Sequence, residues 1–580
     1  MGKKRKLYEE HSINNYRELL QHTVDNYPNQ IAYKFKQKPL TENPSYISIT
    51  YKQFQEDVLA LSTILLNLGL QNKKIAIIGE NRYEWCTSYL AVTTADMIVV
   101  PLDKALPEKE IESLLLRSWA DAIIFDEKYK ETVLRIQKEG KSNLQYLICM
   151  DQQQEKEQVI DYCTLLEEGK NLRQEGNREY EKIKLEKDKM AIMLFTSGTT
   201  SQPKAVMLSQ YNVCANIEAV ASFVKMYPTD TLLSFLPLHH TFECTITFLY
   251  GIYYGVTVAF CDGLRYIQQN LKEYEVTVFV AVPLVLETMY KKICKAIEEK
   301  GKTKLIAGMS KISNALLKCR IDVRKLLFKP VLKEFGGKLR VVFYGAAPMD
   351  KKTIVGYNNL GIKLLQGYGL TETSPVISCE TDEKQRPGSV GYPLYNVAVR
   401  IEPTEEIEEE GIGEILVKGP NVMLGYYENE KATKEVLKQG WFATGDYGYI
   451  DQDGFLYVTG RKKDVIVFKN GKNAYPQELE FLINQLPFVV ESIVYAKERS
   501  GTDLMLGAKI VYNIENVAEY LGTDKTTYEK KIWEEMKKIN KDLPIYKHIK
   551  EIIITEEPLI KTTTQKIKRY QEIKKIQSHV

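Results

Sequence analysis

Short runs of apolar residues recur along the first two thirds of this chain, and each ends in turn residues that lead into a helix-like stretch. The runs are KIAIIGEN from Lys74, DMIVVPLD from Asp96, DAIIFDEK from Asp121, MAIMLFTSG from Met190 and LRVVFYGAAP from Leu339. Buried parallel strands read as continuous apolar runs, and their alternation with helical patterns is typical of α/β units. Periodicity alone does not separate short strands from buried helix segments, but the length and flanks of these runs favour strands.

The pattern changes in the second half of the chain. Between about residues 388 and 427 it becomes short β segments with glycine turns, such as NVAVRIEP and GEILVKGP, and a polar stretch at 152–189 is predicted to be a surface excursion. A Gly-Arg-Lys-Lys-Asp stretch from Gly460 separates two β-rich regions. Because 580 residues exceed what one hydrophobic core usually supports, we predict two domains, 1–460 and 461–580.

Charge and cysteine content narrow the class of protein. Lys and Arg number 79 against 76 Asp and Glu, so the net charge of +3 gives no electrostatic reason to expect a nucleic-acid partner. The nine cysteines contain no CxxC and no Cys/His cluster, which favours a reducing compartment. No apolar run approaches the ~20 residues of a membrane span, and no apolar segment follows the basic amino terminus. We expect a cytoplasmic protein.

The segment TSGTTSQPKAVMLS, from Thr196 to Ser209, is a candidate phosphate cradle. It follows an apolar strand and precedes a plausible helix, and it combines hydroxyl donors, a glycine and one lysine. It lacks the spacing of a Walker motif, and a Ser/Thr-rich surface loop is the alternative interpretation. The residues predicted to hold phosphate are Thr196, Ser197, Gly198, Thr199, Thr200 and Lys204.

Further motifs follow in order. GAAP begins at Gly345 and QGYGLTET at Gln366, where Glu372, with Thr196, is a candidate Mg²⁺ site because this ion prefers oxygen ligands. An ordinary carboxylate at a helix N-terminus is the alternative for Glu372. GWFATGDYGYIDQDG carries Asp446 and TGRKKD carries Arg461, which can hold a ribose diol and a phosphate. LIKTTTQKIKR lies near the carboxyl terminus.

These segments, in this order, resemble the adenylate-forming superfamily of acyl-CoA synthetases, peptide-synthetase adenylation domains and luciferases. The resemblance runs from about Leu19 to Tyr570, and FLPLHHTFE from Phe235 and GWFATGDYG make the chain most similar to bacterial AMP-forming long-chain fatty acid–CoA ligases. It implies an α/β fold, with a large N-terminal domain of α/β subdomains and a distorted β-barrel subdomain. A small, mobile α+β domain follows.

The resemblance also implies a two-step reaction. A medium- to long-chain fatty acid attacks the α-phosphate of Mg-ATP, and coenzyme A then takes the acyl group and releases AMP. It implies roles for residues beyond the phosphate cradle: Thr371 lies near the α-phosphate, and Glu372 and Thr196 bind the metal. The other nucleotide-site residues that it implies are Gly345, Ala346, Gln366, Gly367, Tyr368, Gly369, Asp446, Val458 and Arg461.

By the same resemblance, Lys566 is the catalytic lysine that bridges the carboxylate and the α-phosphate. The alternative is one more exposed lysine of a Lys-rich tail, with Lys561 and Lys568 as neighbours. The family's hinge falls at Lys463, with Asp464 as the alternative, and Gly471 approaches the coenzyme A channel. His240 aligns with a histidine on the acyl-pocket side of the family's active site. The apolar stretch after His240 either belongs to the hydrophobic core alone or also lines a tunnel for the acyl chain.

Several alternatives stay open. Ser201, Ala205 and Gln565 replace family glycines, and a non-glycine residue at a positive φ costs about 1 kcal/mol. The acceptor can be an acyl carrier protein, the acid can be aromatic, or the chain can be a non-catalytic acyl or nucleotide sensor. Basic segments at both ends suggest at most transient contact with a membrane surface. The sequence leaves the oligomeric state open, a homodimer included.

Overall fold

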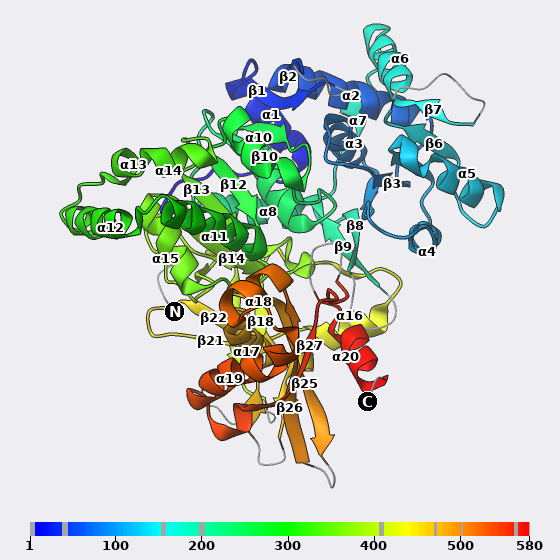
Figure 1. Cartoon of the computed structure of the whole chain (residues 1–580). Coiled ribbons are helices and arrows are strands. Elements are labelled where there is room, and N and C mark those ends of the chain that lie inside the picture. Colours follow the sequence, from blue (N-terminus) through cyan, green and yellow to red (C-terminus); the bar gives the residue numbers. More distant parts are fainter. Residues whose placement is uncertain are drawn as a thin grey trace.

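The computed structural model describes residues 6–37, 44–151, 158–196, 203–404, 411–468, 472–499, 503–561 and 567–578. It is a mixed α/β structure in which two large sheets carry most of the helices, and a smaller β-rich part follows (Figure 1). This agrees with the predicted α/β class.

Within the described residues, one sheet has eight strands and contains four of the five predicted apolar runs. The runs form β3, β4, β5 and β8, and β3 pairs in parallel with β4 and β5 as the pattern predicts. The strand order is β19 (Gly425–Tyr426), β9 (Lys204–Ser209), β8 (Met190–Thr196), β4 (Ile98–Pro101), β3 (Lys74–Ile78), β5 (Ala122–Phe125), β6 (Tyr146–Cys149) and β7 (Ile160–Asp161).

A second sheet has nine strands among the described residues. The fifth predicted run is β13, which pairs in parallel with β12 and β14. The strand order is β16 (Tyr392–Pro393), β15 (Val376–Cys379), β14 (Lys363–Gly369), β13 (Val341–Tyr344), β12 (Val278–Ala281), β10 (Thr231–Ser234), β11 (Thr257–Phe260), β1 (Ile31–Lys36) and β2 (Tyr46–Thr50).

Fifteen α-helices in the described residues precede the β-rich part and pack on these two sheets. Most begin directly after a strand, as expected for α/β units. They are α1 (Tyr16–Asn26), α2 (Tyr51–Asn67), α3 (Tyr83–Thr94), α4 (Glu108–Ser118), α5 (Lys130–Lys138), α6 (Tyr162–Gln174), α7 (Glu179–Lys182), α8 (Gln210–Ala221), α9 (Tyr250–Tyr254), α10 (Ile267–Glu273), α11 (Pro283–Glu299), α12 (Thr303–Lys318), α13 (Arg324–Leu327), α14 (Lys329–Leu332) and α15 (Lys351–Leu360).

The polar stretch predicted as a surface excursion contains more structure than expected. Helix α6 packs against α2, and a Cβ added to Gly169 would lie 2.2 Å from the carbonyl oxygen of Ala60. Tyr162 and Leu165 of the same helix are buried. The prediction was incomplete because these few buried residues are scattered among many exposed Glu, Gln and Lys side chains.

The β-rich region is an antiparallel sheet of β17 (Ala398–Glu402), β18 (Gly413–Lys418), β20 (Leu437–Lys438), β21 (Trp441–Ile450) and β22 (Leu456–Arg461), with helix α16 (Glu430–Val436). NVAVRIEP and GEILVKGP form β17 and β18, which pair with each other as a hairpin. Residues 405–410, between these two strands in sequence, lie outside the described residues.

After Arg461 the chain builds a separate core around Ile466, Leu479, Ile510 and Ile532. This core joins β25 (Val489–Arg499), β26 (Asp503–Tyr512) and β27 (Ile549–Thr555) to α17 (Pro476–Ile483), α18 (Ile514–Leu521) and α19 (Tyr528–Lys541), beside the small pair β23 (Ile466–Val467) and β24 (Asn473–Ala474). Helix α20 (Arg569–Ser578) packs in a second cluster with Ile493 and Val511. The division at 460/461 stays a proposal. In the described part of the chain, no helix is both long and apolar enough to cross a bilayer.

Candidate active site

A large cleft of about 3010 Å³ opens where the two big sheets, the β-rich region and the C-terminal part meet. Its lining contains most of the residues that the motifs single out, although they lie hundreds of positions apart in sequence. Those on the lining are Thr196, Lys204, His239, His240, Gly345, Ala346, Gly367, Tyr368, Gly369, Thr371, Glu372, Arg461, Lys463 and Asp464. The C-terminal part contributes Lys561, Lys568 and Arg569.

The predicted phosphate cradle begins and ends on a β-hairpin. Strands β8 and β9 pair antiparallel, with Thr196 opposite Lys204 at the end of the ladder. The Thr196 hydroxyl donates to the Lys204 carbonyl at 3.3 Å. Helix α8 starts directly after Ser209, which caps it through the Asn212 N–H, so the motif precedes a helix as predicted. The remaining cradle residues, Ser197, Gly198, Thr199, Thr200 and Ser201, lie outside the described residues.

Glu372 is held by a residue that the sequence patterns did not indicate. Tyr426 donates its hydroxyl to Glu372 Oε1 at 3.0 Å, because β19 pairs with β9 and brings Tyr426 to the base of the hairpin. Burial and the neighbouring carboxylate raise the pKa of Tyr426, so it remains a donor. The Lys204 ammonium lies 4.6 Å from the centre of the Tyr426 ring.

The carboxylate of Glu372 and the hydroxyl of Thr196 both border the cleft, and both are hard oxygen donors. Together with triphosphate oxygens this donor set fits Mg²⁺. No second carboxylate is needed at the site, since Mg²⁺ is commonly bound by one or two carboxylates plus substrate phosphates and water.

Close backbone contacts explain the glycines of the two central motifs. A Cβ on Gly345 would lie 2.8 Å from the Gly367 carbonyl oxygen, and one on Gly369 would lie 1.8 Å from the Pro375 carbonyl oxygen. Ala346 has a φ of 70°, in the left-handed region that favours glycine. The backbones of these motifs therefore pack closely, and their glycines line the cleft beside Tyr368.

Asp446 joins two residues of the cleft wall. Its Oδ2 accepts from the Tyr368 hydroxyl at 2.7 Å, and its Oδ1 lies 2.8 Å from Arg461 Nε. Asp446 and Arg461 face each other across the β21–β22 ladder. Burial, followed by the charge of Asp446, raises the pKa of Tyr368 well above its usual value, so the phenol remains a donor.

Three predicted nucleotide-site residues in the described part of the chain are not among the lining residues: Asp446, Gln366 and Val458. Gln366 is buried; its side-chain oxygen accepts from the Tyr344 hydroxyl at 3.0 Å, and its backbone N–H donates to Glu380 Oε2 at 2.9 Å. Val458 sits within β22 opposite Gly448. The positions of Gln366 and Val458 suit support of the wall better than direct contact with a nucleotide.

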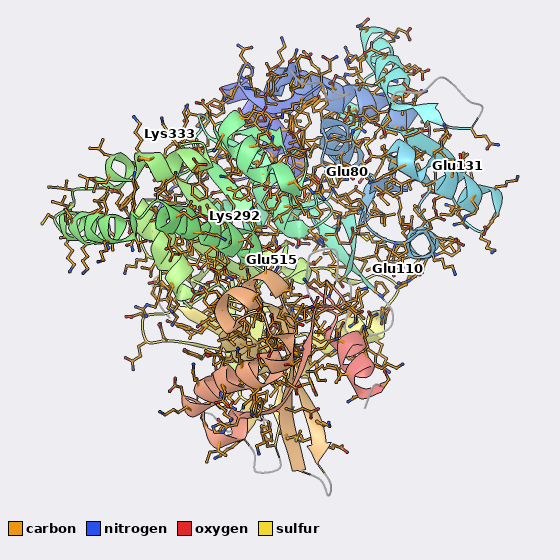
Figure 2. The ribbon with its side chains drawn as sticks, in the orientation of Figure 1. Glu80, Glu110, Glu131, Lys292, Lys333 and Glu515 are labelled. Carbon is orange, nitrogen blue, oxygen red and sulfur yellow. The ribbon has the colours of Figure 1, made fainter. Side chains whose placement is uncertain are left out.

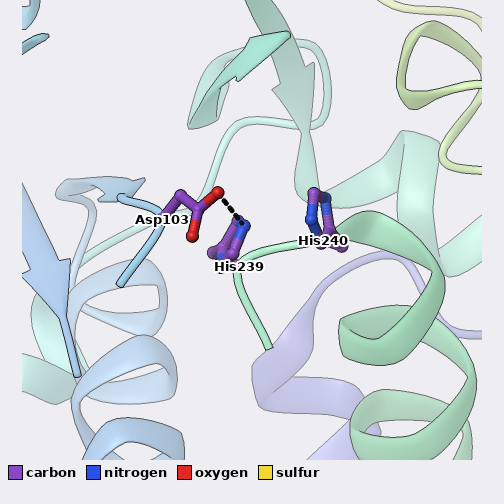
Figure 3. A group of neighbouring side chains, drawn as sticks. All are labelled: Asp103, His239 and His240. Atoms are coloured by element: carbon purple, nitrogen blue, oxygen red, sulfur yellow. Dashed lines mark ion pairs between the residues drawn. The ribbon is translucent and has the colours of Figure 1, made fainter. Parts of the chain in front are cut away.

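On the opposite side of the cleft the two adjacent histidines meet Asp103 (Figure 3). His239 Nε2 lies 3.5 Å from Asp103 Oδ2, and the two imidazole rings are 4.0 Å apart. Burial, with a smaller effect of Lys104, lowers the pKa of His239 to about 3, so its ring is neutral. The three donor atoms lie within 4.8 Å of one another, whereas tetrahedral zinc with bonds of about 2.0 Å requires roughly 3.3 Å.

The wall next to the histidines is a buried π-helix, Glu243–Leu249, followed by α9 and β11. Glu243 accepts from the Ser234 hydroxyl at 2.7 Å and from the Thr247 hydroxyl at 2.9 Å. Burial raises the pKa of Glu243 to about 8, so it is largely protonated at neutral pH. Sequence reasoning did not single out Glu243, because in FECTITFLYG it is one carboxylate within an apolar run.

The C-terminal part reaches the cleft through a short antiparallel bridge between Lys561 and Ile567. Lys561 pairs with Glu491 at 2.5 Å, and Arg569 with Glu480 at 2.5 Å. These contacts fix both ends of residues 562–566. Gln565 and Lys566 lie in that segment, outside the described residues, as does Gly471.

A family model for AMP-binding enzymes matches residues 20–427. This chain belongs to the AMP-binding enzyme family. A second model, for the C-terminal domain of AMP-binding enzymes, matches residues 463–580. The two models together cover most of the chain and leave residues 428–462 between them.

Curated relatives of this AMP-binding enzyme align over most of their length. Long-chain-fatty-acid–CoA ligase 5 of Rattus norvegicus is 27% identical over 93% of this chain and 84% of its own. The long-chain-fatty-acid–acyl-carrier-protein ligase AEE15 of Arabidopsis thaliana is 26% identical over 92% and 82%. Long-chain-fatty-acid–CoA ligase FadD15 of Mycobacterium tuberculosis is 27% identical over 81% and 80%.

Solved structures of AMP-binding enzymes share the fold at low sequence identity. ATP-bound MatB from Rhodopseudomonas palustris has a TM-score of 0.73 and 23% identity over 96% of this chain and 98% of its own. O-succinylbenzoate CoA synthetase from Bacillus subtilis, with its acyl-adenylate, has a TM-score of 0.71 and 23% identity over 96% and 97%.

Proposed function

We propose that this AMP-binding enzyme activates a medium- to long-chain fatty acid with ATP and transfers the acyl group to coenzyme A. The observation that carries the proposal is the cleft, in which the β8–β9 hairpin, Glu372, the Asp446–Arg461 pair and the Lys561–Ile567 bridge face one another. Relatives named as long-chain-fatty-acid–CoA ligases support the choice of acid and acceptor.

In the first step, the residues of the cleft stabilise the negative charge that develops on the phosphoryl oxygens. The hairpin residues Thr196 to Thr200, with Lys204, hold the β- and γ-phosphates, and Thr371 lies beside the α-phosphate. Glu372 and Thr196 hold Mg²⁺, which would neutralise charge on the triphosphate when bound. Lys566 supplies the positive charge that joins the fatty acid carboxylate to the α-phosphate, so that attack releases pyrophosphate.

The opposite wall of the cleft binds the nucleoside. The glycine-lined strand ends at Gly345 and Gly367 accept the adenine next to Tyr368. The Asp446 carboxylate accepts hydrogen bonds from the ribose hydroxyls, and Arg461, which already pairs with it, is free to turn toward ribose or phosphate. His240 and the π-helix side of the cleft face the acid, and its acyl chain runs along that wall.

The second step requires a different arrangement of the C-terminal part. Rotation about Lys463 withdraws the Lys566 segment and brings the stretch around Gly471 to the cleft, where the thiol of coenzyme A attacks the acyl-adenylate. One cleft then serves both half-reactions, with AMP as the leaving group. We place the enzyme in the cytoplasm, where ATP and coenzyme A are available.

A second candidate is transfer of the acyl group to an acyl carrier protein. The relative AEE15, whose name gives that acceptor, aligns over almost the whole chain and supports this alternative. Both candidates share the adenylation step and differ only in the thiol that completes it.

The test is pyrophosphate release from ATP across saturated acids of increasing length, with and without coenzyme A. We expect acid-dependent release that peaks at medium to long chains and multiple turnovers only with coenzyme A, together with AMP and acyl-CoA as products. Turnover with acyl carrier protein but not with coenzyme A would identify the carrier protein as the acceptor. Absence of acid-dependent release under every condition would contradict the proposal.

A further inference from the structure

The stretch of chain that carries the two cleft histidines belongs to no helix or strand. Residues 235–240, the histidine loop, follow β10 and lead toward the buried π-helix. The loop lines the cleft through Phe235, Leu236, Pro237, His239 and His240. Because a loop has no ladder of its own to pair its backbone N–H and C=O groups, other groups must satisfy them. Those partners also fix where the loop places its side chains.

Asn81 supplies three such hydrogen bonds from the other large sheet. Its Nδ2 donates to Ser234 Oγ at 2.9 Å and to the Leu236 carbonyl at 2.7 Å, and its Oδ1 accepts from the Leu238 N–H at 3.3 Å. Asn81 follows β3 of the eight-stranded sheet, whereas Ser234 ends β10 of the nine-stranded sheet. One carboxamide therefore bonds every second residue from the end of β10 into the loop and joins the two sheets there.

The backbone on both sides of Asn81 is held in place. Glu80, which Figure 2 labels on the blue part of the ribbon, donates its backbone N–H to Asp126 Oδ2 at 2.6 Å. On the other side, Arg82 Nη1 lies 3.1 Å from Asp126 Oδ1, and Arg82 Nη2 donates to the Met150 carbonyl at 3.0 Å. Asn81 is thus presented from a fixed support, which a side chain needs if it is to position another part of the site.

The hydrogen bonds continue from the histidine loop into the π-helix. Ser234 Oγ, which accepts from Asn81, donates to Glu243 Oε1 at 2.7 Å, and Glu243 Oε2 accepts from Thr247. Ser234, Glu243 and Thr247 are buried. Loss of the Asn81 donors would leave the Ser234 hydroxyl and the Leu236 carbonyl each short of one partner. Unpaired polar groups of this kind are costly in a protein interior, so the loop would shift to find new partners.

Two further contacts join the histidine loop to the eight-stranded sheet, and both constrain its orientation less. His239 Nε2 lies 3.5 Å from Asp103 Oδ2 (Figure 3), and this is not a pair of opposite charges because burial lowers the pKa of His239 to about 3. The Leu238 side chain is buried in the hydrophobic core, and apolar packing of this kind is not directional. The three hydrogen bonds of Asn81 are directional and therefore set the course of the loop backbone.

We propose that Asn81 is a positioning residue for the acid side of the site. By holding the histidine loop, it places His240 and the apolar lining of the loop against the fatty acid. This rests on the proposed function, which assigns that side of the cleft to the acid. Asn81 itself is not among the lining residues, so it acts through the loop. Its three hydrogen bonds do not reach the β8–β9 hairpin or Asp446, so the binding of ATP should depend on it far less.

The experiment measures pyrophosphate release by the full chain at varied decanoic acid and at varied ATP, together with hydrogen–deuterium exchange of the loop in the free enzyme. Asn81→Asp keeps the shape and the acceptor but removes both N–H donors. We expect KM for decanoic acid to rise about tenfold while KM for ATP stays within about twofold, because a misplacement of about 1 Å can cost as much as a hundredfold. Exchange in a peptide covering 235–240 should become faster. Ser234→Ala removes one of the three bonds and should change both readouts in the same direction by less.

Asn540 offers a matched control, because it makes the same kind of contact in the C-terminal part. Its Nδ2 donates to the Ile549 carbonyl at 2.8 Å, and its Oδ1 accepts from the Ile549 N–H at 2.9 Å. Asn540→Asp should keep the wild-type KM for both substrates and the wild-type exchange of the loop. An unchanged KM for the acid in Asn81→Asp, or an equal rise in KM for acid and ATP, would overturn the proposal. If Asn81→Asp does not fold, the same two outcomes are read from Ser234→Ala.

Hydrogen exchange and catalysis are read separately. A wild-type enzyme without acid-dependent release would refute the proposed function, and faster exchange of the loop in Asn81→Asp would still show that Asn81 holds it. Unchanged exchange in Asn81→Asp, with normal acid-dependent release by the wild type, would overturn the role of Asn81 and leave the proposed function standing.

Discussion

At the scale of single residues, Glu372 depends on Tyr426 for its orientation. Removing the 3.0 Å hydrogen bond by Tyr426→Phe leaves the carboxylate free to rotate away from the metal position. Partners that orient metal ligands typically contribute tenfold or more in affinity. We therefore expect half-maximal activity to require about tenfold more Mg²⁺. The adjacent Tyr427→Phe should leave the Mg²⁺ titration unchanged, and an unshifted titration for Tyr426→Phe would refute this role.

Glu243 makes stability depend on pH in a defined direction. Because its pKa rises to about 8 on folding, the folded state binds more protons than the unfolded state between about pH 4.5 and 8. The free energy of unfolding therefore falls as pH rises through this window, by at most about 1.4 kcal/mol per unit. Glu243→Gln removes this contribution, so the stability of the variant relative to wild type should increase from pH 5.5 to 8.

Chemical denaturation at the two pH values measures this difference. The exposed Glu186→Gln is the matched control and should track the wild type at both. A Glu243→Gln variant that loses stability in parallel with the wild type would show that Glu243 is ionised at little cost in the native protein.

The sequence could indicate Glu372, Asp446 and Arg461 because each stands in a short motif with its own chemistry. It could not indicate Tyr426, which meets Glu372 across 54 positions only because β19 pairs with β9. The contact between Asp103 and His239 is of the same kind, since no local pattern relates a loop after β4 to one after β10. Pairings between distant elements set these contacts.

At the scale of elements, the apolar runs located four strands of the eight-stranded sheet and β13 of the nine-stranded sheet, because strands buried on both faces are continuously apolar. The π-helix at Glu243–Leu249 was less accessible, since an apolar run is compatible with any buried helix or strand. Helix α6 was missed because it has too few apolar residues to form a clear pattern. One narrow face is enough to pack this helix, since Gly169 lies close against Ala60.

The proposed hinge, Lys463, lies in the short 3₁₀ turn Lys462–Asp464. A proline at Lys463 fixes φ near −65° and removes a backbone donor, which restricts rotation there. Lys463→Pro should retain one arrangement only, so pyrophosphate release from ATP and acid is expected to persist while acyl-CoA formation falls at least tenfold. Product analysis by chromatography separates the two.

Lys463→Ala is the control for the hinge. It removes the same side chain but leaves φ free, and both half-reactions should remain near wild type. Equal loss of thioester formation in the alanine variant would assign the effect to the lysine side chain and contradict the hinge.

At the scale of the whole molecule, two features matter for function: the cleft and the distribution of charge. The net charge of the chain conceals the second. The cleft is assembled from four regions of the chain, which ordered motifs can indicate but whose walls only the folded chain defines. The net charge of +3 excludes a strong overall electrostatic field, but this total does not reveal the excess of Lys and Arg in segment 291–333.

The central claim is that one lysine from the C-terminal part completes an adenylation site in the cleft. Its most direct test is a single-turnover measurement of acyl-adenylate and pyrophosphate from ATP and fatty acid, without coenzyme A. We expect Lys566→Ala to reduce the rate by at least a hundredfold with unchanged thermal stability, and the neighbouring Lys568→Ala to remain within severalfold of wild type. Undiminished acyl-adenylate formation by Lys566→Ala would contradict the account.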